Sequence, residues 1–231
     1  MKIRTLTDRG AILSGVIAFF TALNTEAALI SWGVPTPIVG DTDVSLNGTL
    51  VYAVNFQGPS TSLNSVLFEA GPALFTSLNT GSASPPFTDL SAAYQDLLRN
   101  AISSTDSLPA ALDGLIVGVQ YELQLWAHDS GEGWGAYLWQ EDYPLDNYPN
   151  AEVYVPGQNQ GGLGSYVIGT FTADSEIQPF NIGIEGTWVL NATQLRRLDT
   201  TDIPEAGTTV AGLLLMIGTG GVWYRRRMAG R

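Results

Sequence analysis

The chain has 231 residues, no cysteine and a formal net charge of −12, which suits one domain with short appendages and excludes disulfides, thiolate catalysis and cysteine-ligated zinc. Between residues 28 and 202, three arginines stand against nineteen aspartates and glutamates with no lysine, a net charge of −16. Such a field repels phosphate backbones, so nucleic acid is not expected as a partner.

The first 27 residues have the order of parts of a secretory signal peptide. A basic region ends near Arg9, an apolar region runs from 11 to 23, and Thr25 and Ala27 occupy the −3 and −1 positions of a cleavage site. A region of thirteen residues is too short to span a bilayer comfortably. We therefore expect export by the Sec machinery, and a core-facing N-terminal helix is the alternative.

The segment "GDTDV" (40–44) contains an Asp-x-Asp pair, Asp41 and Asp43. Hard oxygen ligands suit calcium, which makes these two carboxylates weak candidates for a structural calcium site. Asx-turn or helix-capping use of both aspartates is the favoured alternative, and no other cofactor is expected.

Residues 28–200 read as one β domain, with short strands between turns. Alternation with a period of two runs through 48–56, 121–129, 166–173, 180–186 and 188–198. Half-buried antiparallel strands of this kind need two sheets packed face to face, so we expect a mainly β fold, an antiparallel β-sandwich. In the first strand, the side chains expected on one face are Leu50, Tyr52, Val54 and Phe56.

One helix interrupts this pattern near 89–102. Apolar residues recur there at helical spacing, with Asp89 as the expected N-cap and Ala101 in the last turn. We expect this helix to pack across an end or edge of the sandwich.

The strand "YELQLWAHD" (121–129) predicts a core face and a polar face. Tyr121, Leu123, Leu125 and Ala127 alternate with Glu122, Gln124, Trp126 and His128. The single histidine, His128, is therefore expected to be solvated at a strand end. No G-x-S-x-G motif accompanies it that would indicate a Ser-His-Asp hydrolase.

The segment "EGWGAYLWQEDYPLDNYPN" (132–150) concentrates aromatic residues among acids and amides. Aromatic rings stack on the apolar faces of sugars while carboxylates and amides bind hydroxyls, so the segment is a candidate glycan-binding site. The alternative is that the rings cap the end of the core. The candidate residues are Trp134, Tyr137, Trp139 and Tyr143, with Tyr148 further along.

Three carboxylates in the same region raise a second possibility. Glu132, Glu141 and Asp142 could flank a glycosidic bond as acid and base. In so acidic a chain, carboxylates close in sequence indicate little, and we expect no catalytic activity.

The C-terminus predicts a membrane helix. Residues 208–224 are uncharged and end with aromatic residues at 223 and 224, and Arg225, Arg226 and Arg227 come next. This is the order of an apolar span, an interfacial aromatic belt and a cytoplasmic basic block. A soluble core helix would show a polar face, and this segment has none.

Residues 201–231 resemble a PEP-CTERM sorting signal, which is carried by Pro204 and Glu205, the apolar helix and the arginine block. Ile203 and Ala206 depart from the family's usual Val-Pro-Glu-Pro. The resemblance implies processing by an exosortase, a Gram-negative envelope, and a place at the cell surface or in an exopolysaccharide matrix.

The segments "ISWG" (30–33), "GDTDVSLNGTLVYAVNF" (40–56), "LQLWAHDS" (123–130), "SYVIGTFTAD" (165–174) and "LNATQLRRL" (190–198) resemble a jelly-roll, galactose-binding-like module of exported PEP-CTERM proteins. The resemblance implies a non-catalytic matrix protein that could bind exopolysaccharide. A structural or adhesive protein that binds other proteins is the alternative, because a fold alone does not carry an activity.

Overall fold

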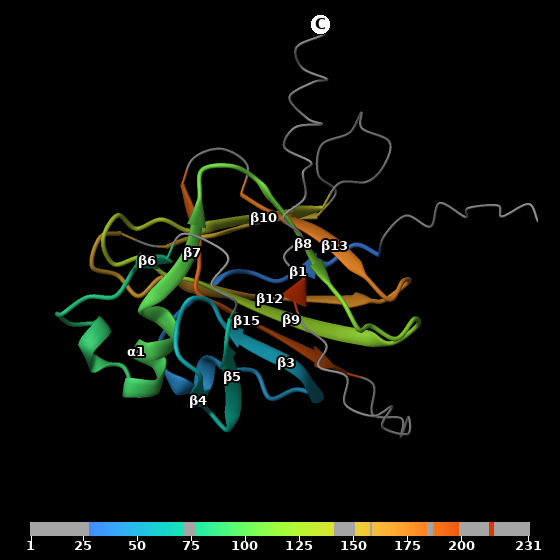
Figure 1. Ribbon diagram of the computed structural model, residues 1–231, viewed down its shortest axis with the longest axis horizontal. Coiled ribbons are helices and arrows are strands. Elements are labelled where there is room, and N and C mark those ends of the chain that lie inside the picture. Colours follow the sequence, from blue (N-terminus) through green and yellow to red (C-terminus); the bar gives the residue numbers. More distant parts are fainter. Residues whose placement is uncertain are drawn as a thin grey trace, which may run out of the picture.

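The computed structural model describes residues 28–71, 77–140, 151–157, 159–183, 187–198 and 213–214. The predicted signal peptide (1–27) and the sorting-signal residues Pro204, Glu205 and Arg225–Arg227 lie outside this part. The described chain is mainly β, with one short α-helix and two 3-10 turns, and its strands form three sheets (Figure 1).

The largest sheet, called here the central sheet, has the strand order β1-β12-β9-β15-β3-β5-β4, and β2 also pairs with β12. Its neighbours are antiparallel except β3 and β5, which run parallel. Its strands are β1 (Ser31–Trp32), β2 (Thr36–Pro37), β3 (Thr49–Asn55), β4 (Thr61–Leu63), β5 (Val66–Ala70), β9 (Gln120–Ala127), β12 (Ser165–Thr172) and β15 (Ala192–Arg197).

Two smaller sheets form a second layer above the central sheet (Figure 1). One has the order β11-β10-β13-β8-β16 and the other the order β14-β7-β6. Their strands are β6 (Ser77–Asn79), β7 (Asn100–Ser104), β8 (Leu108–Leu112), β10 (Ala136–Gln140), β11 (Ala151–Val155), β13 (Gln178–Ile182), β14 (Trp188–Leu190) and β16 (Leu213–Leu214).

The main hydrophobic core lies between these two layers. Leu123 and Leu125 of β9 and Val167 of β12 face Leu138 of β10 and Phe180 of β13, all nearly or fully buried. Burial of this apolar area is the dominant stabilising term for such a sandwich. The predicted β-sandwich is thus confirmed at the level of packed sheets.

A third layer covers the other face of the central sheet, where the sequence predicted a helix but placed it across an end or edge of the sandwich. It comprises the 3-10 turns η1 (Asp41–Asp43) and η2 (Phe87–Asp89) and the helix α1 (Ala92–Leu98), which is drawn below the sheet in Figure 1. A second core of thirteen buried apolar residues, with Phe68, Leu97 and Trp126 among them, fills the space under the sheet. The central sheet is therefore buried on both faces.

A chain of hydrogen bonds ties this third layer to β9. Trp126 Nε1 donates to the Tyr94 hydroxyl of α1 at 3.0 Å, and that hydroxyl donates to Asp43 Oδ2 of η1 at 3.0 Å. Gln124 Nε2 donates to the Asp43 carbonyl at 2.7 Å, while Gln124 Oε1 accepts from Ser45 N at 3.0 Å. Polar groups on a buried face need such partners, because an unpaired buried group is costly.

The prediction that the polar face of 121–129 contacts solvent is therefore wrong. Glu122, Gln124, Trp126 and His128 are all buried, with exposed fractions of 5% or less. The alternation was read correctly, but a polar residue in a strand marks solvent only when nothing covers that face.

The helix is shorter than predicted. Ser91, not Asp89, is the N-cap, and its Oγ accepts from Tyr94 N at 3.2 Å, while Asp89 belongs to η2. Ala101, expected in the last turn, lies in strand β7, which pairs with β6 and β14. At this end of the segment, strand pairing with two neighbours stabilises the chain more than a further helical turn would, although the apolar residues have helical spacing.

A β-bulge corrects the predicted face of β3. Leu195 pairs with Tyr52 and Arg196 pairs with Leu50, so Val51 is the extra residue. Leu50 consequently packs on the helix side, whereas Tyr52 joins the core between the sheets. The prediction that Leu50 shares a face with Tyr52 is wrong.

The alternating run 188–198 is two strands in two layers, and Asn191 lies at the crossing. Its Oδ1 accepts from His128 N at 2.7 Å, and its Nδ2 donates to Thr80 Oγ1 at 3.0 Å and to Leu98 O at 3.0 Å. An amide that can donate and accept is suited to a point where the ladder of each sheet ends.

The predicted membrane helix (208–224) falls almost wholly outside the described residues. The two that are described, Leu213 and Leu214, are extended and pair with β8. Within the described ranges, no helix combines the length and the apolar character that crossing a bilayer requires.

Candidate functional site: an aromatic sheet face

The antiparallel pair β10–β11 forms one margin of the second layer. Directly opposite residues include Tyr137 with Tyr154 and Trp139 with Glu152. Opposed residues share a sheet face and lie about 5 Å apart at Cβ. Tyr154 is 54% exposed and Tyr137 is half-buried. The two tyrosines are therefore neighbours on the outward face of this hairpin.

The inward face of β10 holds the hairpin in place. Ala136 and Leu138 belong to the main core, and Gln140 is 3% exposed. Gln140 Oε1 accepts from Ile30 N at 2.6 Å, and its Nε2 donates to Pro179 O at 3.0 Å. Because core packing and these hydrogen bonds fix β10 from the inside, its outward positions are presented on a rigid element.

The turn before β10 is organised by Asp129, which is 3% exposed. Its carboxylate accepts from the backbone N–H groups of Gly131 at 3.0 Å, Glu132 at 3.2 Å and Trp134 at 3.4 Å. This Asx-type turn fixes the entry to the hairpin. Its charge is used inside the protein rather than offered to a ligand.

Two glycines allow the hairpin ends to cross closely. A Cβ at Gly157 would overlap the carbonyl oxygen of Trp134, and one at Gly135 would overlap the carbonyl oxygen of Val155. Larger residues would push β10 and β11 apart. Trp134, which is half-buried, is thereby held beside the end of β11.

The predicted glycan-binding residues are thus only partly gathered by the described structure. Trp134 lies in the entry turn, and Tyr137 and the backbone of Trp139 lie in β10. Tyr143 and Tyr148 lie outside the described residues. Tyr154 was missed by the sequence reasoning, although the alternating "AEVYV" (151–155) after an acidic loop was a signal for a second hairpin strand.

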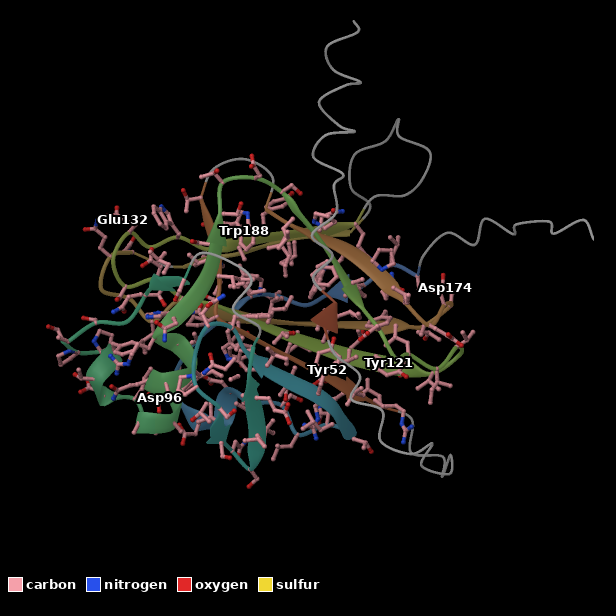
Figure 2. The ribbon with its side chains drawn as sticks, in the orientation of Figure 1. Tyr52, Asp96, Tyr121, Glu132, Asp174 and Trp188 are labelled. Atoms are coloured by element: carbon pink, nitrogen blue, oxygen red, sulfur yellow. The ribbon has the colours of Figure 1, made fainter. Side chains whose placement is uncertain are left out.

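The predicted acid pair for glycoside hydrolysis is not assembled by the described residues. Glu132 is exposed in the entry turn, at the end of the molecule opposite to Asp174 (Figure 2). Glu141 and Asp142 lie outside the described residues, so the separation of the carboxyl groups, on which such a mechanism depends, stays undefined.

The aspartates of "GDTDV" make internal hydrogen bonds. Asp43 Oδ2 accepts from Val39 N at 2.8 Å and Gly40 N at 2.9 Å, and Asp41 Oδ1 accepts from Ser91 Oγ at 2.6 Å. These are the local uses weighed against calcium. Among the described residues, no group of three or more His, Cys, Asp or Glu side chains could hold a metal. The calcium site stays a prediction that a melting-temperature measurement with EDTA would test.

His128 is fully buried, contrary to the expected solvated position. Its ring stacks on Phe87 with centroids 5.3 Å apart, and no hydrogen bond of ordinary geometry reaches either ring nitrogen. Burial lowers the pKa of His128 to about 4, although the backbone of Leu163, the charge of Asp129 and the backbone of Thr80 oppose the shift. His128 is therefore a neutral core residue near pH 7.

Comparison with known proteins adds little to this geometry. No family model and no curated protein matches the chain. Among solved structures it is similar to the ANX2 ectodomain from Arabidopsis thaliana, with 12% identity over 66% of this chain and 50% of that chain, and a TM-score of 0.32. The chain thus spans half the length of that ectodomain, and the similarity is too weak to indicate a fold or a function.

Proposed function

We propose that this chain is an exported, non-catalytic envelope or matrix protein that binds carbohydrate on the outward face of β10–β11. The observation that carries the proposal is the cross-strand placement of Tyr137 and Tyr154, with Tyr154 54% exposed. Aromatic rings on a rigid, solvent-facing strand pair can stack on the apolar faces of sugar rings. The segment 141–150, which lies between these two strands in the sequence, is rich in aromatic and acidic residues.

Export and sorting are proposed from the sequence. The predicted signal peptide (1–27) requires the Sec machinery, and the PEP-CTERM-like residues Pro204, Glu205 and Arg225–Arg227 would be recognised by an exosortase. The expected path is a precursor tethered to the inner membrane by 208–224, followed by release to the surface or matrix. Mass spectrometry of the mature protein tests this. A C-terminus that retains Arg225–Arg227 would contradict sorting.

The binding face is tested with Tyr154→Ala in affinity gels containing exopolysaccharide and on a glycan array. We expect about a tenfold or larger loss of glycan affinity, since one stacked aromatic contributes on the order of 1–2 kcal/mol. The stability change should stay within about 0.5 kcal/mol, because the residue is exposed. Leu67→Ala is the matched control, because Leu67 is 49% exposed on β5 of the central sheet.

A Trp134→Ala, Trp139→Ala double variant tests whether the two predicted tryptophans contribute to binding. Reduced retention in the gel, with an unchanged far-UV spectrum, supports the proposal. Full glycan retention by both this variant and Tyr154→Ala would refute carbohydrate binding at this face.

One observation favours a second function, adhesion to other proteins. Ile116, Val117 and Ile177 are 38%, 58% and 44% exposed in two loops joined by a hydrogen bond from Leu115 N to Glu176 O at 3.2 Å. Neighbouring exposed apolar side chains mark contact surfaces. A Val117→Ser, Ile177→Ser variant that is no longer retained at the cell surface, while it still binds glycan, would favour adhesion.

Turnover of a chromogenic glycoside by the unaltered chain would instead reveal a hydrolase.

A further inference from the structure

Strand β8 pairs along its whole length on one edge, and on the other edge its described partner is the C-terminal strand β16. All five of its residues, Leu108–Leu112, pair with Gln178–Ile182 of β13. On the other side, the pairing found among the described residues joins Ala111 and Leu112 to Leu214 and Leu213 of β16. Pro109 lies within β8, and a proline in a strand is typical of a sheet edge because it has no N–H to donate. β8 is therefore the edge strand of the folded domain.

The edge is held rigid from within. Ala110 and Leu112 are 3% and 0% exposed and belong to the main core between the layers. An edge strand that is fixed in place is a template for another extended segment. The residues around β16 read "VAGLLLM" (210–216), which is uncharged and apolar. Such a segment can pair its backbone without placing a charge against the core.

We propose that the edge of β8 is a strand-docking site and that its occupant is this chain's own C-terminal segment at Leu213–Leu214. The pairing is antiparallel, with Leu213 opposite Leu112 and Leu214 opposite Ala111. The occupant adds a strand through main-chain hydrogen bonds, which is the mode of β-augmentation. This inference does not depend on carbohydrate binding.

The docked strand and the predicted membrane helix exclude each other. A helical residue uses its N–H and C=O groups within the segment, as lipid requires, whereas a strand residue directs them to its neighbour. Leu213 and Leu214 lie in the middle of 208–224, so docking on β8 withdraws the apolar segment from the bilayer. The tail thus has two alternative partners, the sheet edge and the membrane.

The absence of cysteine from the chain allows a clean cross-linking test. In the full chain, Ala111→Cys with Leu214→Cys pairs directly opposed positions, whose Cα separation in an antiparallel ladder suits a disulfide. The matched control is Ala110→Cys with Leu214→Cys, because a shift of one residue along β8 turns the side chain to the other face. We expect an intramolecular disulfide in the first variant at a several-fold higher yield than in the control.

Equal yields in the two variants, or no disulfide in either, would overturn the proposal, and an intermolecular disulfide would show that a second copy occupies the edge. Hydrogen exchange covers the case in which the cysteine variants do not fold. We expect protected amides in β8 of the unaltered full chain, weaker protection with Leu214→Pro, and full protection with Thr208→Pro, since proline cannot donate to the ladder. Equal protection in both proline variants would also overturn docking.

Discussion

The two faces of β9 are equally buried but are built from different chemistry. The face toward the second layer carries Leu123 and Leu125, whose contribution depends on the apolar area removed from water. The face toward α1 carries Gln124 and Trp126, which are paired by hydrogen bonds to η1 and α1, and His128 follows directly after the strand. The first face tolerates any close packing of suitable volume, whereas the second requires specific partners at specific positions.

The largest expected effect tests the apolar face. Leu125 is 1% exposed between the two layers. Leu125→Ala should lower the free energy of unfolding by about 3 kcal/mol, because it removes apolar contacts and leaves a cavity. Urea denaturation followed by tryptophan fluorescence measures the change. A loss below about 1 kcal/mol would show that this face is not the main source of stability.

A pH-dependent effect of similar size tests the other face at His128. The unfolded chain binds a proton near pH 6.5 and the folded chain only near pH 4, so the unfolded state holds more protons between these values. The free energy of unfolding is therefore highest above pH 6.5, and it falls by up to about 3 kcal/mol as the pH is lowered toward 4.

The control for this effect is His128→Phe, which keeps a ring against Phe87 and removes the titrating group. Urea unfolding of both proteins at pH 7, 5.5 and 4.5 separates the histidine from the carboxylates, because the carboxylates are common to both. If the two proteins lose stability in parallel as the pH falls, His128 does not carry a depressed pKa.

The smallest expected effect compares one hydroxyl on each face. Tyr94→Phe leaves the buried Trp126 N–H without its acceptor and should cost about 2 kcal/mol. Tyr121→Phe removes the acceptor of the Ile116 N–H. Because the residue Ile116 is 38% exposed, its N–H can bond to water instead, and the free energy of unfolding should fall by only about 0.5–1 kcal/mol. Thermal unfolding of both variants gives the ratio. Equal losses of stability would mean that the hydrogen bonds at α1 stabilise the fold no more than the hydrogen bond of Tyr121 does.

Sequence patterns predicted the strands of this protein better than their environments. The alternation in 121–129 correctly placed Leu123 and Leu125 toward a core. It could not show that α1 and η1 cover the opposite face, because that depends on contacts between residues about 30 to 80 positions apart. The prediction of the face of Leu50 was wrong for a comparable reason, because the bulge at Val51 is defined by the pairing of β3 with β15.

The candidate site shows the same division. Composition drew attention to Trp134 and Tyr137, but their relation to Tyr154 required the register of β10 on β11. The sequence marked Asp43 as a weak calcium candidate and did not single out Asp129, and only their hydrogen bonds identified both as internal acceptors.

The sequence by itself determined the β class, the approximate positions of β3, β9, β12, β13, β14 and β15 among the sixteen described strands, and the composition that makes 132–150 and the two termini distinctive. These properties follow from local periodicity and from residue chemistry, which neighbouring residues specify. The tertiary structure alone decided that the central sheet has two buried faces, that 188–198 divides between two layers at Asn191, and that Leu213–Leu214 reach the edge of β8. Burial and pairing depend on which distant segments meet, and no local pattern encodes that choice.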